Sequence, residues 1–98
     1  MSERQYFIYI MTTMMNTVLY TGVTNDLRRR VFEHRSGKGR NFTNRYKVYK
    51  LVYYETGSSI DAALTREKQI KGGSRGKKIE LIKSINPNWE DIFDKYFE

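Results

Sequence analysis

The sequence predicts an α+β fold, in which a small three-stranded, mainly antiparallel sheet carries packed helices in the order β-β-α-β-α-α. Two short aromatic and apolar segments near the N-terminus are close enough in sequence to form an antiparallel hairpin. A third such segment follows a basic stretch, and two segments with helical spacing of apolar residues come after it. Strands of this kind can bury their apolar side chains only if the helices pack on the sheet.

The strands are predicted from aromatic and β-branched residues. Residues 5–11 (QYFIYIM) and 18–23 (VLYTGV) form the hairpin, and the polar turn between them is expected to expose Met14 and Met15. Residues 48–55 (VYKLVYYE) alternate imperfectly between apolar and polar side chains, and they are expected to form the third strand.

The first helix is predicted to follow the hairpin. It begins near Leu27, with Asn25 or Asp26 as its cap, and ends near Ser36. Its inward face is expected to hold three residues at helical spacing, Leu27, Val31 and His34.

Two further helices are expected over residues 60–71 and 75–85. Ser58 and Asp61 resemble a capping box before the earlier one, and Ser74 is a candidate cap for the later one. The residues expected to face inward are Ile60, Ala63, Leu64, Glu67 and Ile70, followed by Ile79, Ile82 and Ile85.

The chain is expected to form a single domain over residues 1–98. A hydrophobic content of 39% and an aromatic content of 14% argue against disorder and suffice for one modest core. Residues 86–98 are interpreted as a closing segment that packs back on this core. The side chains expected to make these contacts are Trp89, Ile92, Phe93 and Tyr96.

Composition excludes several classes of protein. The chain has no cysteine, which rules out disulfides and Cys-based metal sites, and its single histidine rules out a multi-histidine metal cage. The apolar runs are too short to span a bilayer, and residues 1–4 lack the core of a signal peptide. We therefore expect a cytoplasmic protein that does not bind membranes.

The formal net charge of +7 is unevenly distributed. Residues 28–50 hold nine Lys or Arg and one acidic residue, and residues 72–83 add four more cations and one acid. Such a basic region indicates a polyanionic partner, most often nucleic acid, although it is also compatible with a solvated surface that keeps the protein dispersed. The cations expected to bind nucleic acid are Arg28, Arg29, Arg35, Lys38, Arg40, Arg45, Lys47, Arg75, Lys77 and Lys78.

Glu67 is a carboxylate on an otherwise apolar helix face, three residues from both Leu64 and Ile70. A charge placed there costs free energy unless a partner compensates it. The partner is either a salt-bridging cation or a divalent metal ion, which prefers oxygen ligands.

Arg30 and His34 are four residues apart and project from neighbouring turns of one helix. Arginine suits phosphate because it is planar, permanently charged and bidentate, but Arg30 is also compatible with being one more cation of a basic helix. His34 can carry a proton or simply pack. Tyr9 and Tyr20 are core aromatics unless nearby groups favour proton transfer from their phenols. Gly22, within a strand, indicates a close approach by another group.

In this order and spacing, these residues resemble the GIY-YIG nuclease domain, and more narrowly its small stand-alone bacterial members. Phe7-Ile8-Tyr9 stands where the family has its first tripeptide, and Tyr20-Thr21-Gly22 where it has its second. Arg30, ten residues after Tyr20, falls on the family's catalytic arginine. His34 matches a His/Tyr position one turn later, and Glu67 matches the metal-binding glutamate.

The resemblance covers about residues 5–85. Phe7 replaces the first glycine of the family pattern and Thr21 replaces an aliphatic residue, while both tyrosines and the second glycine are retained. Many members also have an asparagine late in the domain. Asn86 is the nearest candidate here, although its spacing after Glu67 is long.

The resemblance implies an endonuclease that hydrolyses phosphodiester bonds in DNA, without sequence or structure preference of its own. One Mg²⁺ or Mn²⁺ ion would be held by Glu67, waters and the scissile phosphate, and would stabilise the leaving oxygen. Tyr20, or Tyr9 in its place, would help to deprotonate the attacking water. Arg30 would neutralise the non-bridging oxygens, and His34 would support proton transfer.

The sequence is compatible with two other functions. The chain is also compatible with a nucleic-acid-binding module of weak or no catalytic activity in DNA repair or recombination, because it offers little surface for a targeting module. A protein partner would then supply the targeting. A third possibility is an adaptor whose residues 89–97 dock on a partner, although core closure explains that segment equally.

Overall fold

The computed structural model describes residues 5–37 and 46–96 and contains one antiparallel sheet with the strand order β2-β1-β3. The strands are β1 (Tyr6–Thr12), β2 (Leu19–Thr24) and β3 (Lys50–Gly57). The predicted three-stranded sheet is therefore confirmed, although β3 begins and ends two residues later than expected.

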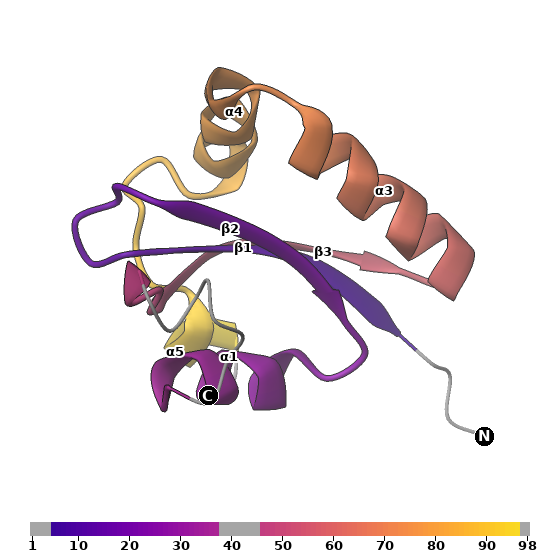
Figure 1. Ribbon diagram of the computed structural model, residues 1–98, viewed down its shortest axis with the longest axis horizontal. Coiled ribbons are helices and arrows are strands. Elements are labelled where there is room, and N and C mark those ends of the chain that lie inside the picture. The colour runs from indigo at the N-terminus through magenta and orange to yellow at the C-terminus, as the bar shows by residue number, and fades with distance from the viewer. Residues whose placement is uncertain (1–4, 38–45, 97–98) are drawn as a thin grey trace.

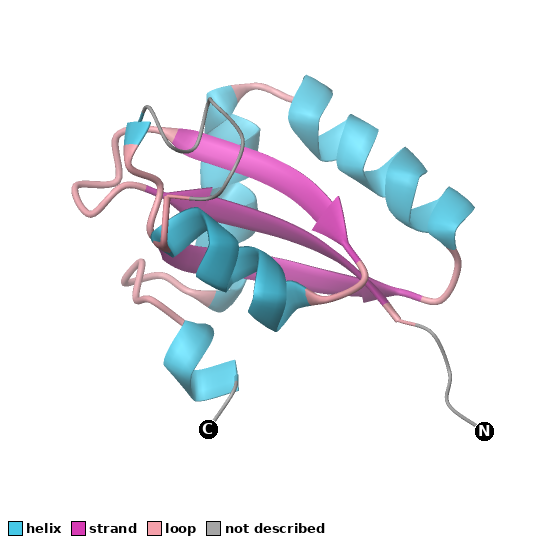
Figure 2. Ribbon diagram, turned by 60° about the horizontal axis from the view of Figure 1, so that its bottom comes forward, coloured by secondary structure: helices cyan, strands magenta, loops and turns pink. Residues whose placement is uncertain are grey.

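Helices cover both faces of this sheet (Figure 1). One layer contains α1 (Leu27–Arg35) and the short α5 (Phe93–Tyr96), and the other contains α3 (Ile60–Gly72) and α4 (Arg75–Ile85). Figure 2 brings α1 in front of the strands that it crosses. Because β1 is the central strand and is covered on both sides, all of its residues after the first are buried. No helix in the described ranges is long and apolar enough to cross a bilayer.

The core is divided by the sheet into two clusters, one on each face. Alternate residues of β1 supply both, because successive side chains of a strand point to opposite faces. The cluster on the α1 face contains Phe7, Tyr9, Met11, Leu27, Val31, Val48 and Leu51. The cluster on the α3 and α4 face contains Ile8, Ile10, Val52, Tyr53, Ala63, Ile70 and Ile82.

A β-bulge in β3 decides which of its side chains face which layer. The pairing with β1 shifts between Ile10 and Met11, which lie opposite Tyr53 and Leu51, so that Val52 is the extra residue. Leu51 therefore faces α1, while Tyr53 faces α3. The side chain of Asn86 donates a hydrogen bond to the Val52 carbonyl oxygen at 3.1 Å, which satisfies a backbone acceptor at the bulge.

Side-chain caps fix the start of each longer helix. The Asp26 carboxylate accepts a hydrogen bond from the Arg29 backbone N–H at 3.1 Å, and Ser74 accepts one from Lys77 at 3.2 Å, as predicted. The cap of α3 is Ser59 rather than the expected Ser58. The predicted capping box is therefore wrong, because the residue three after Ser59 is Ala62, which has no side-chain acceptor.

The predicted inward faces of α3 and α4 are partly wrong. Only Ala63 and Ile70 of α3 are buried, whereas Ile60 is 45% exposed and Leu64 is 39% exposed. The reason is that α3 meets the sheet along one narrow line, with Ala63 packed 3.7 Å from the position of a Cβ at Gly57. Residues on the flanks of that line rotate toward solvent. In α4, Ile82 is buried but Ile85 is 55% exposed.

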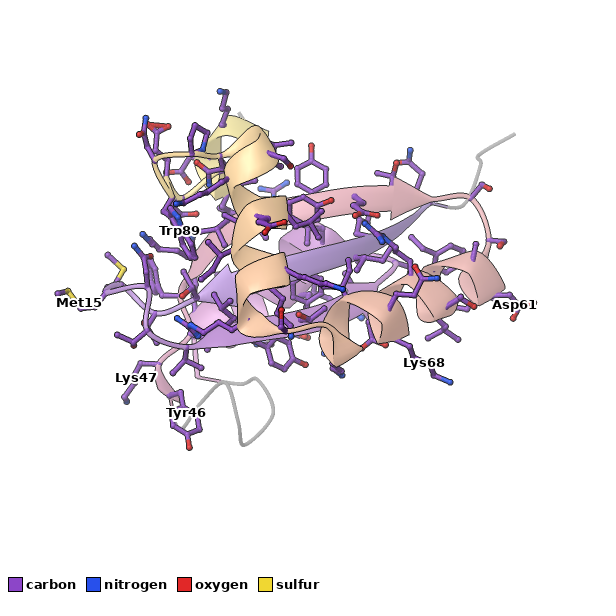
Figure 3. All side chains as sticks on the ribbon, turned by 90° about the horizontal axis from the view of Figure 1, so that it is seen from above. Met15, Tyr46, Lys47, Asp61, Lys68 and Trp89 are labelled. Atoms are coloured by element: carbon purple, nitrogen blue, oxygen red, sulfur yellow. The ribbon has the colours of Figure 1, made fainter. Side chains whose placement is uncertain are left out.

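Several side chains that were expected in solvent do lie there. Met15 is 81% exposed at the tip of the hairpin, and Met14 is 62% exposed. In Figure 3, Met15 extends away from the sheet, and Asp61 and Lys68 point outward from α3. The turn prediction is confirmed.

Candidate active site

A hydrogen bond between a phenol and an imidazole lies in the core on the α1 face. Tyr9 Oη is 3.0 Å from His34 Nε2, and the pair is buried. Tyr9 comes from the middle of β1, and His34 comes from the last turn of α1, so the packing of α1 on the sheet makes the contact. Their side chains are 1% and 3% exposed.

Tyr20 completes this group from the neighbouring strand. Its ring centroid lies 5.2 Å from that of His34, in an edge-to-face arrangement, and 6.2 Å from that of Tyr9. Tyr20 is only partly buried, because β2 is the edge strand of the sheet. We call Tyr9, Tyr20 and His34 the phenol–imidazole cluster. The structure thus brings together three of the five residues that were predicted to be catalytic.

Burial keeps His34 uncharged. Desolvation is the main cause that lowers its pKa from 6.5 to about 4, and the positive charge of Arg30 acts in the same direction, against the opposing effect of Glu33. At neutral pH the imidazole is therefore neutral and can either accept or donate a proton at Nε2. Its Nδ1 atom is buried and has no hydrogen-bond partner among the residues that the structure describes.

Arg30 lies beside this cluster on the same helix, one turn before His34. Its side chain is 27% exposed, and its Nε atom is buried without a hydrogen-bond partner within the described chain. The Glu33 carboxylate is 3.8 Å from that nitrogen, which makes a loose ion pair rather than a hydrogen bond. A guanidinium that is partly buried and incompletely bonded is suited to bind an anion.

Gly22 explains how the Tyr9 phenol reaches His34. Gly22 lies directly opposite Tyr9 in the β1–β2 pair. A Cβ atom at position 22 would lie 2.6 Å from Tyr9 Oη and 2.7 Å from Tyr9 Cζ, which is closer than real Cβ contacts come. The close approach predicted from the sequence is therefore made by the Tyr9 ring, which lies across the strand where a side chain would otherwise stand.

Glu67 lies on α3, in the layer on the opposite face of the sheet from α1 (Figure 1). Its side chain is only 13% exposed, and Oε2 is 2.9 Å from Nζ of Lys71, one turn later on the same helix. Of the two partners that the sequence left open, the structure contains the salt-bridging cation. The helix α3 also packs on β2, the edge strand that carries Tyr20.

The donor set at Glu67 is compatible with Mg²⁺ in one specific way. Within residues 5–37 and 46–96, no group of three or more acidic or histidine side chains could enclose a metal. Mg²⁺, however, commonly keeps several waters and takes only one or two carboxylates together with a substrate phosphate. A single, largely buried carboxylate such as that of Glu67 fits this mode of binding.

The cations predicted to bind nucleic acid differ in their exposure and in their hydrogen bonds within the protein. Arg28, Arg29 and Lys47 are exposed on the surface, with the Arg29 side chain 64% exposed. Lys78 Nζ donates hydrogen bonds to the carbonyl oxygens of Lys71 and Gly73, and Arg75 donates one to Asn16. Lys77 is exposed. The remaining three predicted cations lie outside the described residues: Lys38, Arg40 and Arg45.

Arg35 is held inside the protein and does not lie free on the surface. Its guanidinium forms an ion pair with Asp91, donates a hydrogen bond to the Tyr49 carbonyl oxygen at 3.0 Å, and lies between the rings of Tyr49 and Phe93, 4.4 and 4.5 Å from their centroids. This geometry corresponds to a structural role, because Arg35 ties the closing segment to α1 and β3.

Asn86 likewise has a structural environment. Its side-chain amide donates to the carbonyl oxygens of Val52 and Glu90, and its side-chain oxygen accepts from the Glu90 backbone N–H. Three bonds to backbone groups account for this buried amide, and they place it at the bulge of β3 rather than in the phenol–imidazole cluster.

A polar network on the α3 face was not predicted from the sequence. Tyr53 Oη donates to Glu55, whose carboxylate accepts three further hydrogen bonds from Arg66 of α3, at 3.0, 3.1 and 2.8 Å. These contacts lower the pKa of Glu55, chiefly through the Arg66 hydrogen bond. The available signal was the spacing of Tyr53 and Glu55, which places both on one face of a strand.

The chain is similar to known proteins in its sequence. The sequence matches the family described as "GIY-YIG catalytic domain" over residues 5–80. It is 43% identical to a UPF0213 protein of Syntrophus aciditrophicus, over 83% of this chain and 92% of that one. It is 39% identical to a UPF0213 protein of Natronomonas pharaonis, over 79% and 89% of the two chains.

A solved structure shows the same fold. The solution NMR structure of a UPF0213 protein from Bacillus halodurans superposes with a TM-score of 0.55 at 32% sequence identity, covering 89% of this chain and 92% of that one. The matched segment includes all five residues predicted to be catalytic, from Tyr9 to Glu67. The chain therefore belongs to the GIY-YIG family of nucleases, and within it to the UPF0213 proteins.

Proposed function

We propose that this protein is a metal-dependent endonuclease that hydrolyses phosphodiester bonds in DNA. The observation that carries the proposal is the hydrogen bond between Tyr9 and a neutral His34, with the incompletely bonded guanidinium of Arg30 one helical turn away. A core that only required packing would not need a phenol, an imidazole and an arginine at the same point, because buried polar groups cost free energy when they lack partners.

The neutral imidazole gives the phenols a route for proton transfer. A phenol titrates near pH 10 and is a poor base on its own. Because His34 Nε2 is within hydrogen-bond distance of Tyr9 Oη, the phenol would pass its proton to the imidazole as it takes one from the attacking water, which would approach past the partly exposed Tyr20. His34 also fixes the orientation of the Tyr9 ring, so that it acts as a positioning residue.

Arg30 would bind the non-bridging oxygens of the scissile phosphate and stabilise the charge that develops on them. Its side chain is 27% exposed and its Nε atom has no hydrogen-bond partner in the described chain, so the guanidinium can turn toward a phosphate without losing an internal hydrogen bond at that atom. Arg28 and Arg29 lie in the first turn of the same helix, where the helix dipole disfavours cations. A bound phosphate backbone would offset that cost.

Glu67 would hold the divalent ion, and Mg²⁺ or Mn²⁺ when bound would stabilise the leaving oxygen. Lys71 must then release the carboxylate. The Lys71 side chain is 59% exposed, and exposed ion pairs contribute little to stability. Replacing Lys71 by a metal ion at Glu67 would therefore cost little free energy. The oxygen ligands besides Glu67 would come from water and the DNA backbone.

The test is nicking of supercoiled plasmid in Mg²⁺ and in Mn²⁺ by the purified chain and two arginine variants. We expect Arg30→Ala to lower the nicking rate by about a hundredfold or more, since it removes a charge at the reacting phosphate. Lys83→Ala is the control, because it removes an exposed cation of α4 that has no assigned part in binding nucleic acid. Equal residual rates in the wild-type protein and Arg30→Ala would reveal a contaminating nuclease.

A second candidate function is nucleic-acid binding without cleavage, with a protein partner that directs the domain to sites of DNA repair or recombination. The Glu67–Lys71 ion pair favours it, because the carboxylate is already compensated without a metal. Salt-sensitive DNA binding, combined with no cleavage in any divalent metal, would support this function over the first.

A further inference from the structure

The outer flank of α1 presents an aromatic side chain where a basic helix would be expected to present polar ones. Phe32 is 65% exposed, the largest exposed fraction of any aromatic residue among those described. A single exposed apolar side chain is ordinary on a protein surface. Phe32 differs because it separates two hollows of about 360 and 380 Å³, which share Phe32 and Phe93 as lining residues.

These two hollows together form what we call the Phe32 groove. Its lining is both aromatic and cationic. The eight lining residues are Asp26, Arg28, Arg29, Phe32, Arg35, Ser36, Tyr49 and Phe93. The set has three guanidinium groups and one carboxylate. Asp26 accepts the backbone N–H of Arg29 as the cap of α1, and Arg35 is paired with Asp91. Arg28 and Arg29 therefore set the charge that a ligand meets.

The groove is separate from the phenol–imidazole cluster. Residues two apart on an α-helix differ by about 200° around its axis, so Phe32 lies on the opposite flank of α1 from Arg30. Arg29 lies between these flanks. A polynucleotide strand that passes Arg30 can reach Phe32 by crossing the outer surface of α1, about one helix width of 10–12 Å.

We propose that the Phe32 groove is a second binding subsite, which takes an unpaired nucleotide of a single-stranded nucleic acid flanking the scissile phosphate. Its base would stack on the Phe32 ring, and its phosphate would lie at Arg28 and Arg29. This proposal rests on the proposed function and names its substrate class. Aromatic rings beside basic side chains are how proteins bind single strands without reading sequence, since every base has a flat face to stack.

The charge of the groove favours a nucleic acid over an apolar protein segment. The exposed Arg28 would remain unpaired under an apolar partner, and Arg29 would keep only its loose ion pair with Glu33 at 3.8 Å, whereas a phosphate compensates both guanidinium groups and the helix dipole together. Either partner would bury the flat, exposed ring of Phe32. The charge of the groove is therefore what favours a nucleic acid over an apolar protein segment.

The proposal is tested by fluorescence anisotropy with two labelled probes, a short single strand and a blunt hairpin duplex of the same composition, in EDTA so that no cleavage occurs. We expect the wild-type protein to bind the single strand more tightly. Phe32→Ala should weaken single-strand binding by about tenfold and leave duplex binding within about twofold, because only an unpaired base can stack. Phe32→Trp should restore single-strand affinity.

Ile85→Ala is the matched control, because Ile85 is 55% exposed on a helix of the opposite layer. It should leave both affinities unchanged. Thermal unfolding of each variant checks that the fold is retained. Equal losses on both probes in Phe32→Ala, or no loss on either, would overturn the proposal, and so would a Phe32→Trp variant as weak as Phe32→Ala.

The subsite and the nuclease proposal fail in different ways. If Phe32→Ala binds both probes normally while Arg30→Ala loses plasmid nicking, the groove is not a nucleotide subsite and the nuclease assignment stands. If the single-strand preference depends on Phe32 but no variant or metal gives cleavage, the groove remains and the chain is a binding module. If neither probe is bound, both proposals are wrong.

Discussion

Two groups of polar side chains, one on each face of the sheet, differ in how completely they are hydrogen-bonded. On the α1 face, His34 Nδ1 and Arg30 Nε are buried without hydrogen-bond partners among the described residues, and burial keeps the imidazole neutral. On the α3 face, Tyr53, Glu55 and Arg66 satisfy one another through several hydrogen bonds.

This difference separates stability from function. A buried polar atom without a partner costs about 1–3 kcal/mol, so a protein retains one only where something else uses it. The phenol–imidazole cluster accepts that cost beside an arginine, while the Tyr53–Glu55–Arg66 network avoids it by pairing, which raises the pKa of Arg66 chiefly through its hydrogen bonds to Glu55. We therefore interpret the phenol–imidazole cluster as reactive and the Tyr53–Glu55–Arg66 network as its support.

Gly22→Ala should produce the largest change in stability and activity, because it disturbs the phenol–imidazole cluster at Tyr9. The added Cβ would lie 2.6 Å from Tyr9 Oη, and the Tyr9 ring is too buried to move freely. We expect a loss of about 3 kcal/mol in the free energy of unfolding, at the upper end of overpacking effects, together with loss of nicking. Urea denaturation measures the first quantity.

Gly76→Ala is the control for this substitution. Gly76 lies within α4, and the nearest atom to an added Cβ would be Ser74 Oγ at 3.9 Å. Alanine is favoured over glycine inside a helix, so this variant should be stabilised by about 0.5–1 kcal/mol. If both variants shift stability equally, the contact between Gly22 and Tyr9 is not what requires the glycine.

The neutral state of His34 predicts the next effect, a dependence of stability on pH. The pKa is about 4 in the folded protein and near 6.5 when unfolded, so between these values the unfolded chain binds more protons. Stability is then full above pH 6.5 and falls as the pH drops toward 4. We expect this residue to contribute of the order of 2 kcal/mol to the difference.

The measurement compares the wild-type protein with His34→Gln by urea denaturation at pH 7 and pH 4. Carboxylates also titrate in this range, so the informative quantity is the difference between the two proteins. His34→Gln should lose less stability on acidification. Two proteins with the same pH dependence would mean that the imidazole is not desolvated as described.

How far the sequence predicts this arrangement depends on the range of the interactions involved. Strand and helix identities follow from local composition, and the burial of Leu27, Val31 and His34 follows from helical spacing. The contact between Tyr9 and His34, 25 residues apart, was implied only by the family resemblance. Spacing alone could not show that the phenol reaches across Gly22 to the imidazole.

The errors occurred where tertiary packing overrides local pattern. Ile60 and Leu64 follow helical spacing but are exposed, because α3 contacts the sheet only along the line of Ala63 and Ile70. Arg35 was predicted to bind nucleic acid, and its ion pair with Asp91, more than fifty residues later, could not be foreseen from spacing. Such distant partners leave no periodic signal in one sequence.

Substitutions in the Tyr53–Glu55–Arg66 network should change stability and activity less than substitutions in the phenol–imidazole cluster. Glu55→Gln keeps the size of the side chain but removes the charge that Arg66 binds. Because the Arg66 side chain is 39% exposed, we expect a loss of only about 1 kcal/mol by urea denaturation. Nicking by the folded variant should stay within about twofold of wild type. A stable Glu55→Gln protein without activity would show that the Tyr53–Glu55–Arg66 network also takes part in the chemistry.

Lys71→Ala gives the smallest expected change in stability and the sharpest test of Glu67. The ion pair is exposed on the lysine side, so its removal should change the free energy of unfolding by less than about 0.5 kcal/mol. If Glu67 holds the metal, removing its competitor should lower the Mg²⁺ concentration at which nicking is half-maximal. Lys68→Ala is the control, because Lys68 adjoins Glu67 in sequence but points away from the sheet (Figure 3). The same Mg²⁺ dependence in both variants would assign Glu67 to the structural pairs of the α3 face, and the divalent ion, if one is needed, would have to bind elsewhere.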